Sequence, residues 1–362
     1  MRLSLAALAL ACLSGGSRDV SVAAAAWVPA TTGKPGSSRF GIAAGGGLHE
    51  LSRRDLARYL NGVQAVRAGW IRFVINWEVI QRDGARRYDW ARFDPVIAAA
   101  RRRGIAVLGV IAYTPPWARP AGTTGAYPPT HIESYARFAK VAVQHFSRAG
   151  VRAYEIWNEP NVARFWRPAP DVVRYTQMLK RAYSAIKSAD PAATVVSGGL
   201  APHGMYGQND RENINPLSFL ERMYANGASG SLDAVGWHPY AFPHDLNFAL
   251  WSAWSQMTAT TPSALSIMGA YGDGRRQIWA TEFGAPTGTT GYAVSEAAQA
   301  QLVTDAFAAL CAAPWAGPAF LYSYRDDGTD PADFEHSLGL VRHDWSAKPA
   351  YRAYQASATA GC

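Results

Sequence analysis

The chain has 362 residues, of which 49% are hydrophobic and 17% charged, and its formal net charge is +8. This apolar content is enough for a large core and excludes an intrinsically disordered chain. Arginine supplies most of the positive charge and is scattered along the predicted helices, which does not indicate a nucleic-acid-binding protein. The length fits one α/β barrel of about 250 residues with insertions.

The N-terminal segment, residues 1–26, is predicted to be an export signal. It has a weakly positive start, a short apolar stretch from Leu3 to Leu13 and small residues before Trp27. The apolar stretch is too short to span a bilayer, and the residues before Cys12 fit lipid attachment poorly. We therefore expect a secreted protein with no membrane span, in which residues 27–38 form a flexible leader.

Apolar runs then alternate with stretches of helical periodicity, which is the pattern of repeated strand–helix units. Strands are expected to begin near Phe40, Trp70, Ile105, Val151, Thr194, Leu232, Gln277 and Pro318. Helices are expected over residues 55–67, 90–103, 132–149, 171–188, 216–226, 248–271 (in pieces), 296–312 and 342–356. Eight such units predict a single-domain α/β fold over 39–362, a (β/α)8 TIM barrel. An open doubly wound sheet is the alternative, but the first predicted strand lacks the GxGxxG turn typical of it.

Two cysteines, Cys311 and Cys362, would remain in the mature chain. In an oxidising compartment they can pair, and two unrelated thiols are the alternative. Neither lies in a CxxC motif or beside a histidine cluster, so we expect no metal and no cofactor. Four aspartates at 326, 327, 330 and 333 lack the spacing of an EF-hand loop, and we interpret them as a solvated turn.

Two glutamates follow apolar runs at the predicted ends of the fourth and seventh strands. Glu159 lies in the string WNEPN (157–161) and Glu282 in the string WATEFG (279–284). Barrel enzymes build their sites at the C-terminal ends of strands, so we expect the two carboxyl groups to face each other across the barrel mouth. Paired carboxyl groups are what a glycosidase uses, one as the acid and one as the nucleophile.

Four polar residues are expected to support this pair. Arg72 and Tyr240 are candidates to keep Glu282 ionised, and Asn158 can hydrogen-bond a sugar 2-hydroxyl. His238 can orient Glu159 or exchange a proton with it. The alternatives are a structural ion pair for Arg72 and an ordinary turn around His238.

Aromatic residues near the same strand ends are the other signal for carbohydrate. Trp77, Trp117 and Trp166 follow the second, third and fourth predicted strands. Their flat rings can stack on the apolar face of a sugar or pack in the core, and the sequence leaves both open.

The string from Tyr154 to Asn161, followed by Phe165 and Trp166, resembles the retaining glycoside hydrolases of clan A, in particular family 39 and the cellulase-like proteins of family 5. The strings at 114–118 and 338–351 fit the same group, and the resemblance covers residues 39–356. It implies that Glu159 is the general acid/base and Glu282 the nucleophile, with support from Arg72, Asn158, His238 and Tyr240.

One segment departs from the clan. Where the clan usually presents a tryptophan at the end of strand eight, this chain has FLYSYRDD (320–327). We therefore expect Tyr324 to take the place of that sugar platform, with Arg325 and Asp326 as further sugar contacts.

The sequence as a whole predicts an exported, retaining O-glycosidase that cleaves an oligo- or polysaccharide through a glycosyl-enzyme intermediate. A non-catalytic carbohydrate-binding barrel is the alternative, but its usual signature is the loss of one glutamate. A barrel enzyme of another class is disfavoured because no lysine falls at a predicted strand end. The sugar, the linkage and the oligomeric state are not set by the sequence.

Overall fold

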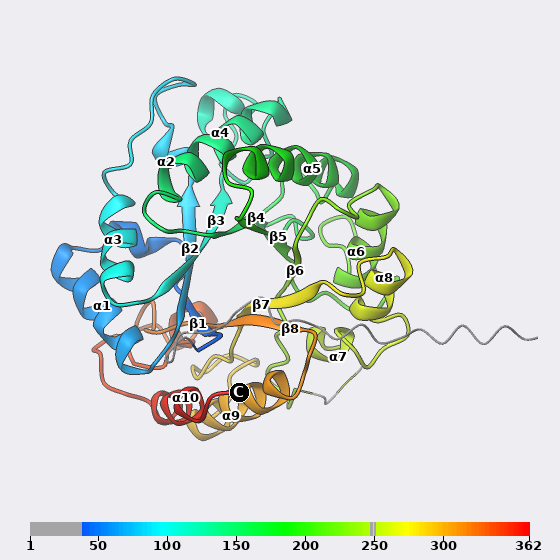
Figure 1. Cartoon of the computed structure of the whole chain (residues 1–362). Helices are drawn as coiled ribbons and strands as arrows, with labels where there is room; N and C mark the ends of the chain where they lie inside the picture. Colours follow the sequence, from blue (N-terminus) through cyan, green and yellow to red (C-terminus); the bar gives the residue numbers. More distant parts are fainter. Residues whose placement is uncertain (1–37, 247–248, 250) are drawn as a thin grey trace, which may run out of the picture. The chain divides into compact units, whose positions relative to one another are not determined.

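A computed structural model describes residues 38–246, 249 and 251–362, and Figure 1 shows the whole chain. The predicted export signal (1–26) and all but the last residue of the predicted leader (27–38) lie outside the described residues, so both stay predictions. Among the described residues, no helix is long and apolar enough to cross a membrane.

Eight parallel strands close into one barrel in sequence order, with the first strand paired to both the second and the eighth (Figure 1). The strands are β1 (Phe40–Ala43), β2 (Trp70–Asn76), β3 (Ala106–Ala112), β4 (Ala153–Asn158), β5 (Thr194–Gly199), β6 (Ala234–Trp237), β7 (Gln277–Phe283) and β8 (Ala316–Tyr322). Each begins within two residues of its predicted start. The predicted TIM barrel is confirmed, and the open sheet is excluded.

Helices surround the barrel and connect its strands (Figure 1). They are α1 (Arg53–Ala65), α2 (Trp77–Ile80), α3 (Asp94–Arg102), α4 (Ile132–Phe146), α5 (Val172–Ala189), α6 (Pro216–Ala225), α7 (Ala253–Gln256), α8 (Ala264–Ala270), α9 (Glu296–Cys311) and α10 (Pro349–Ala360). Short 3-10 turns lie at η1 (Gly47–Glu50), η2 (Pro116–Ala118) and η3 (Phe334–Ser337). Side-chain caps fix several starts: Ser52, Asp171 and Ser295 each accept a hydrogen bond from a backbone N–H of the first turn.

The last helix begins later than predicted, at Pro349 instead of Arg342. Proline fits the first turn of a helix because it has no N–H to satisfy there. The residues before Pro349 form turns. Lys348 occupies the N-cap position, and its side chain makes no capping hydrogen bond.

The core has two layers. A small apolar cluster occupies the barrel interior and consists of Ala43, Leu108, Ala153, Val196, Ala234, Trp279 and Phe320. A much larger cluster lies between the outer face of the strands and the helices. The strands therefore read as nearly continuous apolar runs, as expected where both faces of a parallel sheet are buried.

A disulfide joins Cys311, the last residue of α9, to Cys362. It closes a loop that includes β8 and α10, and thus ties the end of the chain to the barrel. The pairing that the sequence left open is therefore formed in the structure.

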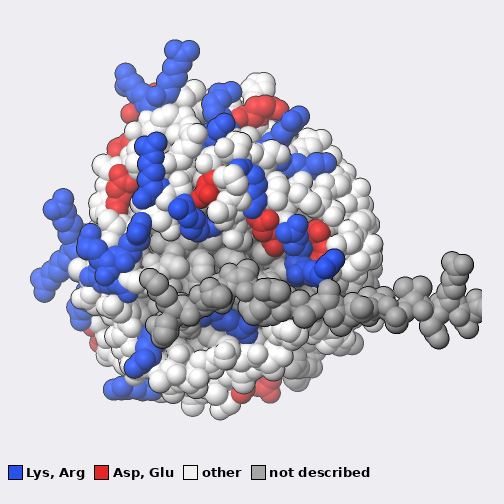
Figure 2. Space-filling view, in the orientation of Figure 1, with Lys and Arg blue, Asp and Glu red and all other residues white. Residues whose placement is uncertain are grey.

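The surface shown in Figure 2 carries Lys and Arg side chains in several separate groups, with Asp and Glu among them. This distribution agrees with the scattered arginines of the sequence.

Candidate active site

Five of the predicted site residues come together at one end of the barrel. Arg72 lies in β2, Glu159 follows β4, His238 and Tyr240 follow β6, and Glu282 lies in β7. One oxygen of Glu159, one nitrogen of His238 and one oxygen of Glu282 lie within 4.8 Å of one another. The carboxyl groups of Glu159 and Glu282 therefore face the same space.

Glu282 is held by two donors. Arg72 Nη1 lies 2.5 Å from Oε1, and the Tyr240 hydroxyl donates to Oε2 at 2.8 Å. Burial alone would raise the pKa of Glu282, but the charges of His238 and Arg72 and the hydrogen bond from Tyr240 outweigh it and hold the pKa below its usual value. Glu282 is therefore ionised at neutral pH.

Glu159 has a different partner and an unusual backbone. His238 Nδ1 lies 2.7 Å from Glu159 Oε1 and 3.8 Å from Glu282 Oε2. Glu159 has a φ of 44° and Trp157 a φ of 71°, a left-handed conformation that costs energy in residues other than glycine. This local strain turns the Glu159 side chain toward the cleft, where it is 14% exposed.

His238 is fully buried between the two glutamates. Burial lowers its pKa, but the charge of Glu282 and the hydrogen bond and charge of Glu159 outweigh it and raise the pKa above the usual value. A positive charge on His238 then favours the ionised form of Glu282.

Arg72 connects Glu282 to two other residues. Its Nη2 donates to Asn158 Oδ1 at 2.8 Å, and its Nε and Nη2 bind the two oxygens of Glu155 at 2.6 and 3.0 Å. This contact holds the Asn158 side chain at the barrel mouth beside Glu159, and its contact with a sugar 2-hydroxyl stays a prediction. Glu155, in the middle of β4, was not among the predicted site residues, although a charged residue inside an apolar strand is itself a signal.

A cleft of about 470 Å³ is lined by five of the residues described above: Arg72, Asn158, Glu159, Tyr240 and Glu282. Its walls include aromatic side chains that the sequence did not single out as site residues: Tyr113, Phe165, Phe242, Tyr322 and Phe334. Such rings suit sugars, whose apolar faces pack on flat side chains. The signal that could have found them is their position just after strand ends or within the long loops of the barrel mouth.

A third carboxylate, Glu335 in η3, also lines the cleft. It pairs with Arg164, from the loop after β4, at 3.0 Å. Because β4 and β8 lie on opposite sides of the barrel, this pair joins two loops that face each other across the mouth. Arg164 is mostly exposed, so the pair contributes little to stability.

The three predicted tryptophans do not line this cleft. Trp77 is fully buried and stacks on Phe138 of α4 at 5.4 Å, and Trp166 packs edge-on against Trp157 and Tyr175. Trp117 is half-buried, and its Nε1 donates to the backbone oxygen of Gln81. These positions correct the expected sugar contacts: the residues follow strand ends, but their rings turn outward into the layer between the barrel and the helices.

Tyr324 is also corrected. It packs against Tyr59 of α1, with ring centroids 5.0 Å apart, and does not line the cleft. The tyrosine at the mouth is Tyr322, the last residue of β8. The inward–outward alternation of a strand ends where the strand ends, so it cannot be extended from Tyr322 to Tyr324.

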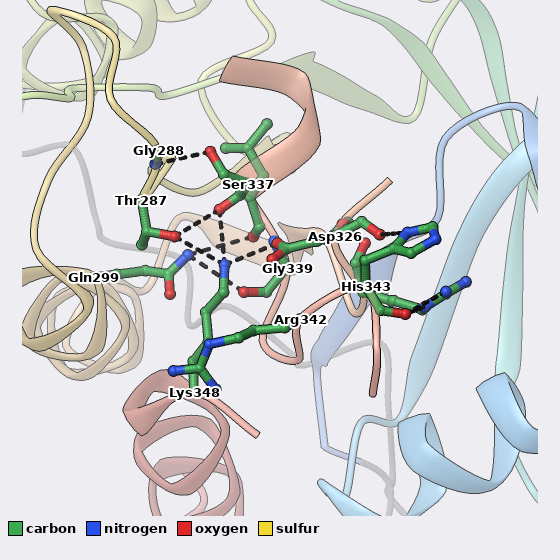
Figure 3. A network of polar contacts seen from close by, with 12 residues as sticks. Thr287, Gly288, Gln299, Asp326, Ser337, Gly339, Arg342, His343 and Lys348 are labelled. Carbon is green, nitrogen blue, oxygen red and sulfur yellow. Dashed lines mark hydrogen bonds and ion pairs between the residues drawn. The ribbon is translucent and has the colours of Figure 1, made fainter. Parts of the chain in front are cut away.

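Arg325 and Asp326 are structural as well. Arg325 donates to the backbone oxygen of His343 and stacks over Trp345. Figure 3 shows Asp326 in a polar network with Lys348, whose Nζ lies 2.8 Å from Asp326 Oδ1 and also binds Thr287 and Ser337. This network ties the loops after β7 and β8 to the start of α10, and so anchors the segment that carries Phe334 and Glu335.

Among the residues that the structure describes, Glu159, His238 and Glu282 form the one group of three donors close enough for a metal ion. The two oxygens of Glu282 are already bound by Arg72 and Tyr240. A further cation would have to displace or approach the Arg72 guanidinium, which disfavours it. The group is better suited to acid–base chemistry.

Known structures share this fold. A family 39 glycoside hydrolase from Bacteroides cellulosilyticus WH2 superposes with a TM-score of 0.69 at 23% identity, covering 89% of this chain and 63% of that one. A monomeric β-xylosidase from Caulobacter crescentus CB15 gives 0.64 at 19%, covering 87% and 67%. A GH5_18 protein from Streptomyces cattleya, E153A in complex with Manβ1-4GlcNAc, gives 0.65 at 18%, covering 89% and 80%.

The chain therefore spans about two thirds of the length of the first two structures. No curated protein sequence matches it. Residues 49–315 match the family model Cellulase (glycosyl hydrolase family 5). Because this match spans more than half of the chain, the protein belongs to glycosyl hydrolase family 5.

Proposed function

We propose that the protein is an exported, retaining O-glycosidase that cleaves an oligo- or polysaccharide by double displacement. The observation that carries this proposal is that one carboxylate oxygen of Glu159 lies within 4.8 Å of one carboxylate oxygen of Glu282. Retaining glycosidases place their carboxyl groups about 5–5.5 Å apart, whereas inverting enzymes need about 6.5–9.5 Å to admit a water.

The two glutamates have distinct roles in the proposed mechanism. Glu282, ionised and fixed by Arg72 and Tyr240, attacks the anomeric carbon while Glu159 donates a proton to the departing oxygen. The glycosidic bond breaks and an ester to Glu282 forms. Glu159, now a base, removes a proton from water, which attacks the same carbon and releases Glu282. Two inversions leave the anomeric configuration unchanged.

The test begins with purified protein and aryl β-xylosides, β-glucosides and β-mannosides, together with xylan, β-glucan and mannan. These include the glycosides named for two of the similar structures, a β-xylosidase and a complex with Manβ1-4GlcNAc. NMR of the first product should show the anomer of the substrate, and a 2-fluoro glycoside should label Glu282. Glu282→Gln should abolish turnover while leaving the fold, followed by circular dichroism, intact. An inverted product, or near-normal turnover by this variant, would reject the mechanism.

The export part of the proposal rests on residues 1–26 and is supported by the Cys311–Cys362 disulfide, because disulfides persist in oxidising compartments. The expected mature N-terminus is Trp27. Sequencing the N-terminus of protein recovered from the culture medium tests it, and an intact Met1 on protein retained in the cell would contradict it.

A further inference from the structure

Glu155 is a charged residue in the interior of the barrel with no access to solvent. It lies in β4, four residues before Glu159, and its side chain is fully buried. A buried carboxylate is costly unless it is paired and hydrogen-bonded. Glu155 is satisfied: besides Arg72, it accepts the backbone N–H of Gly199 at 2.8 Å, and Thr281 Oγ1 lies 3.4 Å away.

The partner of Glu155 is the residue that holds the nucleophile. Arg72 directs Nε and Nη2 at Glu155 in the two-pronged geometry that guanidinium and carboxylate groups favour. This contact fixes the plane of the guanidinium, which leaves Nη1 directed at Glu282 and Nη2 at Asn158. The orientation of both groups at the barrel mouth therefore depends on a contact one layer below it.

The positive charge of Arg72 is also shared between the two carboxylates that it contacts. Arg72 lies between two carboxylates, so its single positive charge is divided between Glu155 and Glu282. If Glu282 had the whole charge, its ionised form would be held more tightly and would be a weaker nucleophile. A divided charge keeps Glu282 ionised and still reactive.

We propose that Glu155 is a positioning residue of the glycosidase, which orients Arg72 and takes up part of its charge so that Glu282 stays an effective nucleophile. This inference rests on the proposed function. The charged and titratable groups that face Glu282 are Arg72, Tyr113, Glu159, His238, Tyr240, Tyr322 and Glu335. Those that face Glu155 are Arg72, Tyr135 and Tyr175.

The variant that tests the proposal is Glu155→Gln, which keeps the shape of the side chain and removes its charge. With an aryl glycoside that the wild type cleaves, we expect kcat to fall about 10- to 100-fold, as when a reacting group is misplaced slightly. The acid limb of the kcat/KM profile should move to lower pH, because Glu282 then has the whole charge of Arg72. An acid limb that stays in place or moves to higher pH would overturn the proposal.

Glu155→Asp keeps the charge but is too short for the same two-pronged contact. It should lose activity while its acid limb stays near that of the wild type, and a limb that moves as in Glu155→Gln would count against charge sharing. Asp273→Asn is the matched control, because it removes another buried carboxylate, one that pairs with Arg276 and does not line the cleft. It should lower the melting temperature and leave the acid limb unmoved.

A readout without turnover separates this proposal from the proposed function. Carbon-13 NMR of glutamate carboxyl groups, assigned with Glu282→Gln, follows the ionisation of Glu282 directly. Its titration midpoint should be lower in Glu155→Gln than in the wild type, and an unchanged midpoint would refute the inference. Wild-type protein that neither cleaves a glycoside nor is labelled at Glu282 would instead refute the proposed function.

Discussion

Replacing Tyr240 with phenylalanine removes one hydrogen bond to the nucleophile and little else. The lost contact is the 2.8 Å bond from the Tyr240 hydroxyl to Glu282 Oε2. A hydrogen bond to a charged group contributes about 1.5–3 kcal/mol, and Glu282 is only 13% exposed, so water replaces little of it. Since about 1.4 kcal/mol corresponds to a factor of ten in rate, we expect kcat/KM to fall about 10- to 100-fold.

The same substitution changes the pH profile in a fixed direction. The Tyr240 hydrogen bond is one of the causes that hold the pKa of Glu282 below its usual value. Without it, that pKa rises, and because the reaction needs ionised Glu282, the acid limb of kcat/KM moves to higher pH. This shift is opposite to the one expected for Glu155→Gln.

The assay is the pH dependence of kcat/KM with the best aryl glycoside, alongside a thermal melt. Tyr354→Phe is the control, because it also removes a buried tyrosine hydroxyl, which donates to the Gly41 carbonyl away from the cleft. It should cost about 1 kcal/mol of stability and leave the acid limb in place. A Tyr240→Phe profile with an unmoved acid limb, or one shifted to lower pH, would refute the reasoning.

Three further outcomes are expected. Glu159→Gln should lower kcat/KM by about 10²- to 10⁴-fold for natural glycosides. The loss should be much smaller for dinitrophenyl glycosides, because their leaving group needs no proton. Equal losses on both substrates would contradict the role of Glu159 as the acid. Trp77→Ala should reduce the free energy of unfolding by about 3–5 kcal/mol in a urea titration and leave KM unchanged. A raised KM at unchanged stability would instead indicate that Trp77 contacts the substrate. Replacing Cys311 and Cys362 with serine should cost about 4 kcal/mol of stability, the loop-closure value for the 51-residue separation. The folded protein should keep its activity, and an unchanged melting temperature would contradict this prediction.

The repeat of strand and helix was predictable because each element has a local signal in the sequence, either an apolar run or a helical periodicity. Apolar runs bounded by polar turns indicate the strands, and both predicted glutamates lie at the ends of such runs. Because the C-terminal ends of all barrel strands lie on one face, the two glutamates were predicted to meet there. Asn158, His238 and Tyr240 follow from the same rule, because each lies at or just after a strand end. Arg72 lies within β2 and was predicted as a charged residue inside an apolar run.

The aromatic residues could not be assigned this way. Trp77 and Tyr322 both lie at strand ends, yet Trp77 is buried against α4 and Tyr322 faces the cleft. A residue at a strand end continues the inward–outward alternation only while the strand lasts. Beyond it, the direction of a ring depends on which neighbouring helix or loop offers a packing surface.

What the sequence by itself determined is therefore the barrel and the identity of its paired carboxyl groups, since both depend on periodicity and on distance along the chain. Only the tertiary structure decided that Glu155 shares Arg72 with Glu282, that Arg164 meets Glu335 across the mouth, and that left-handed backbone at Trp157 and Glu159 aims the acid. The two ion pairs join strands and loops that are far apart in sequence. Arg164 and Glu335 have no local signature, and the charge of Glu155 inside an apolar strand does not tell which residue it will meet.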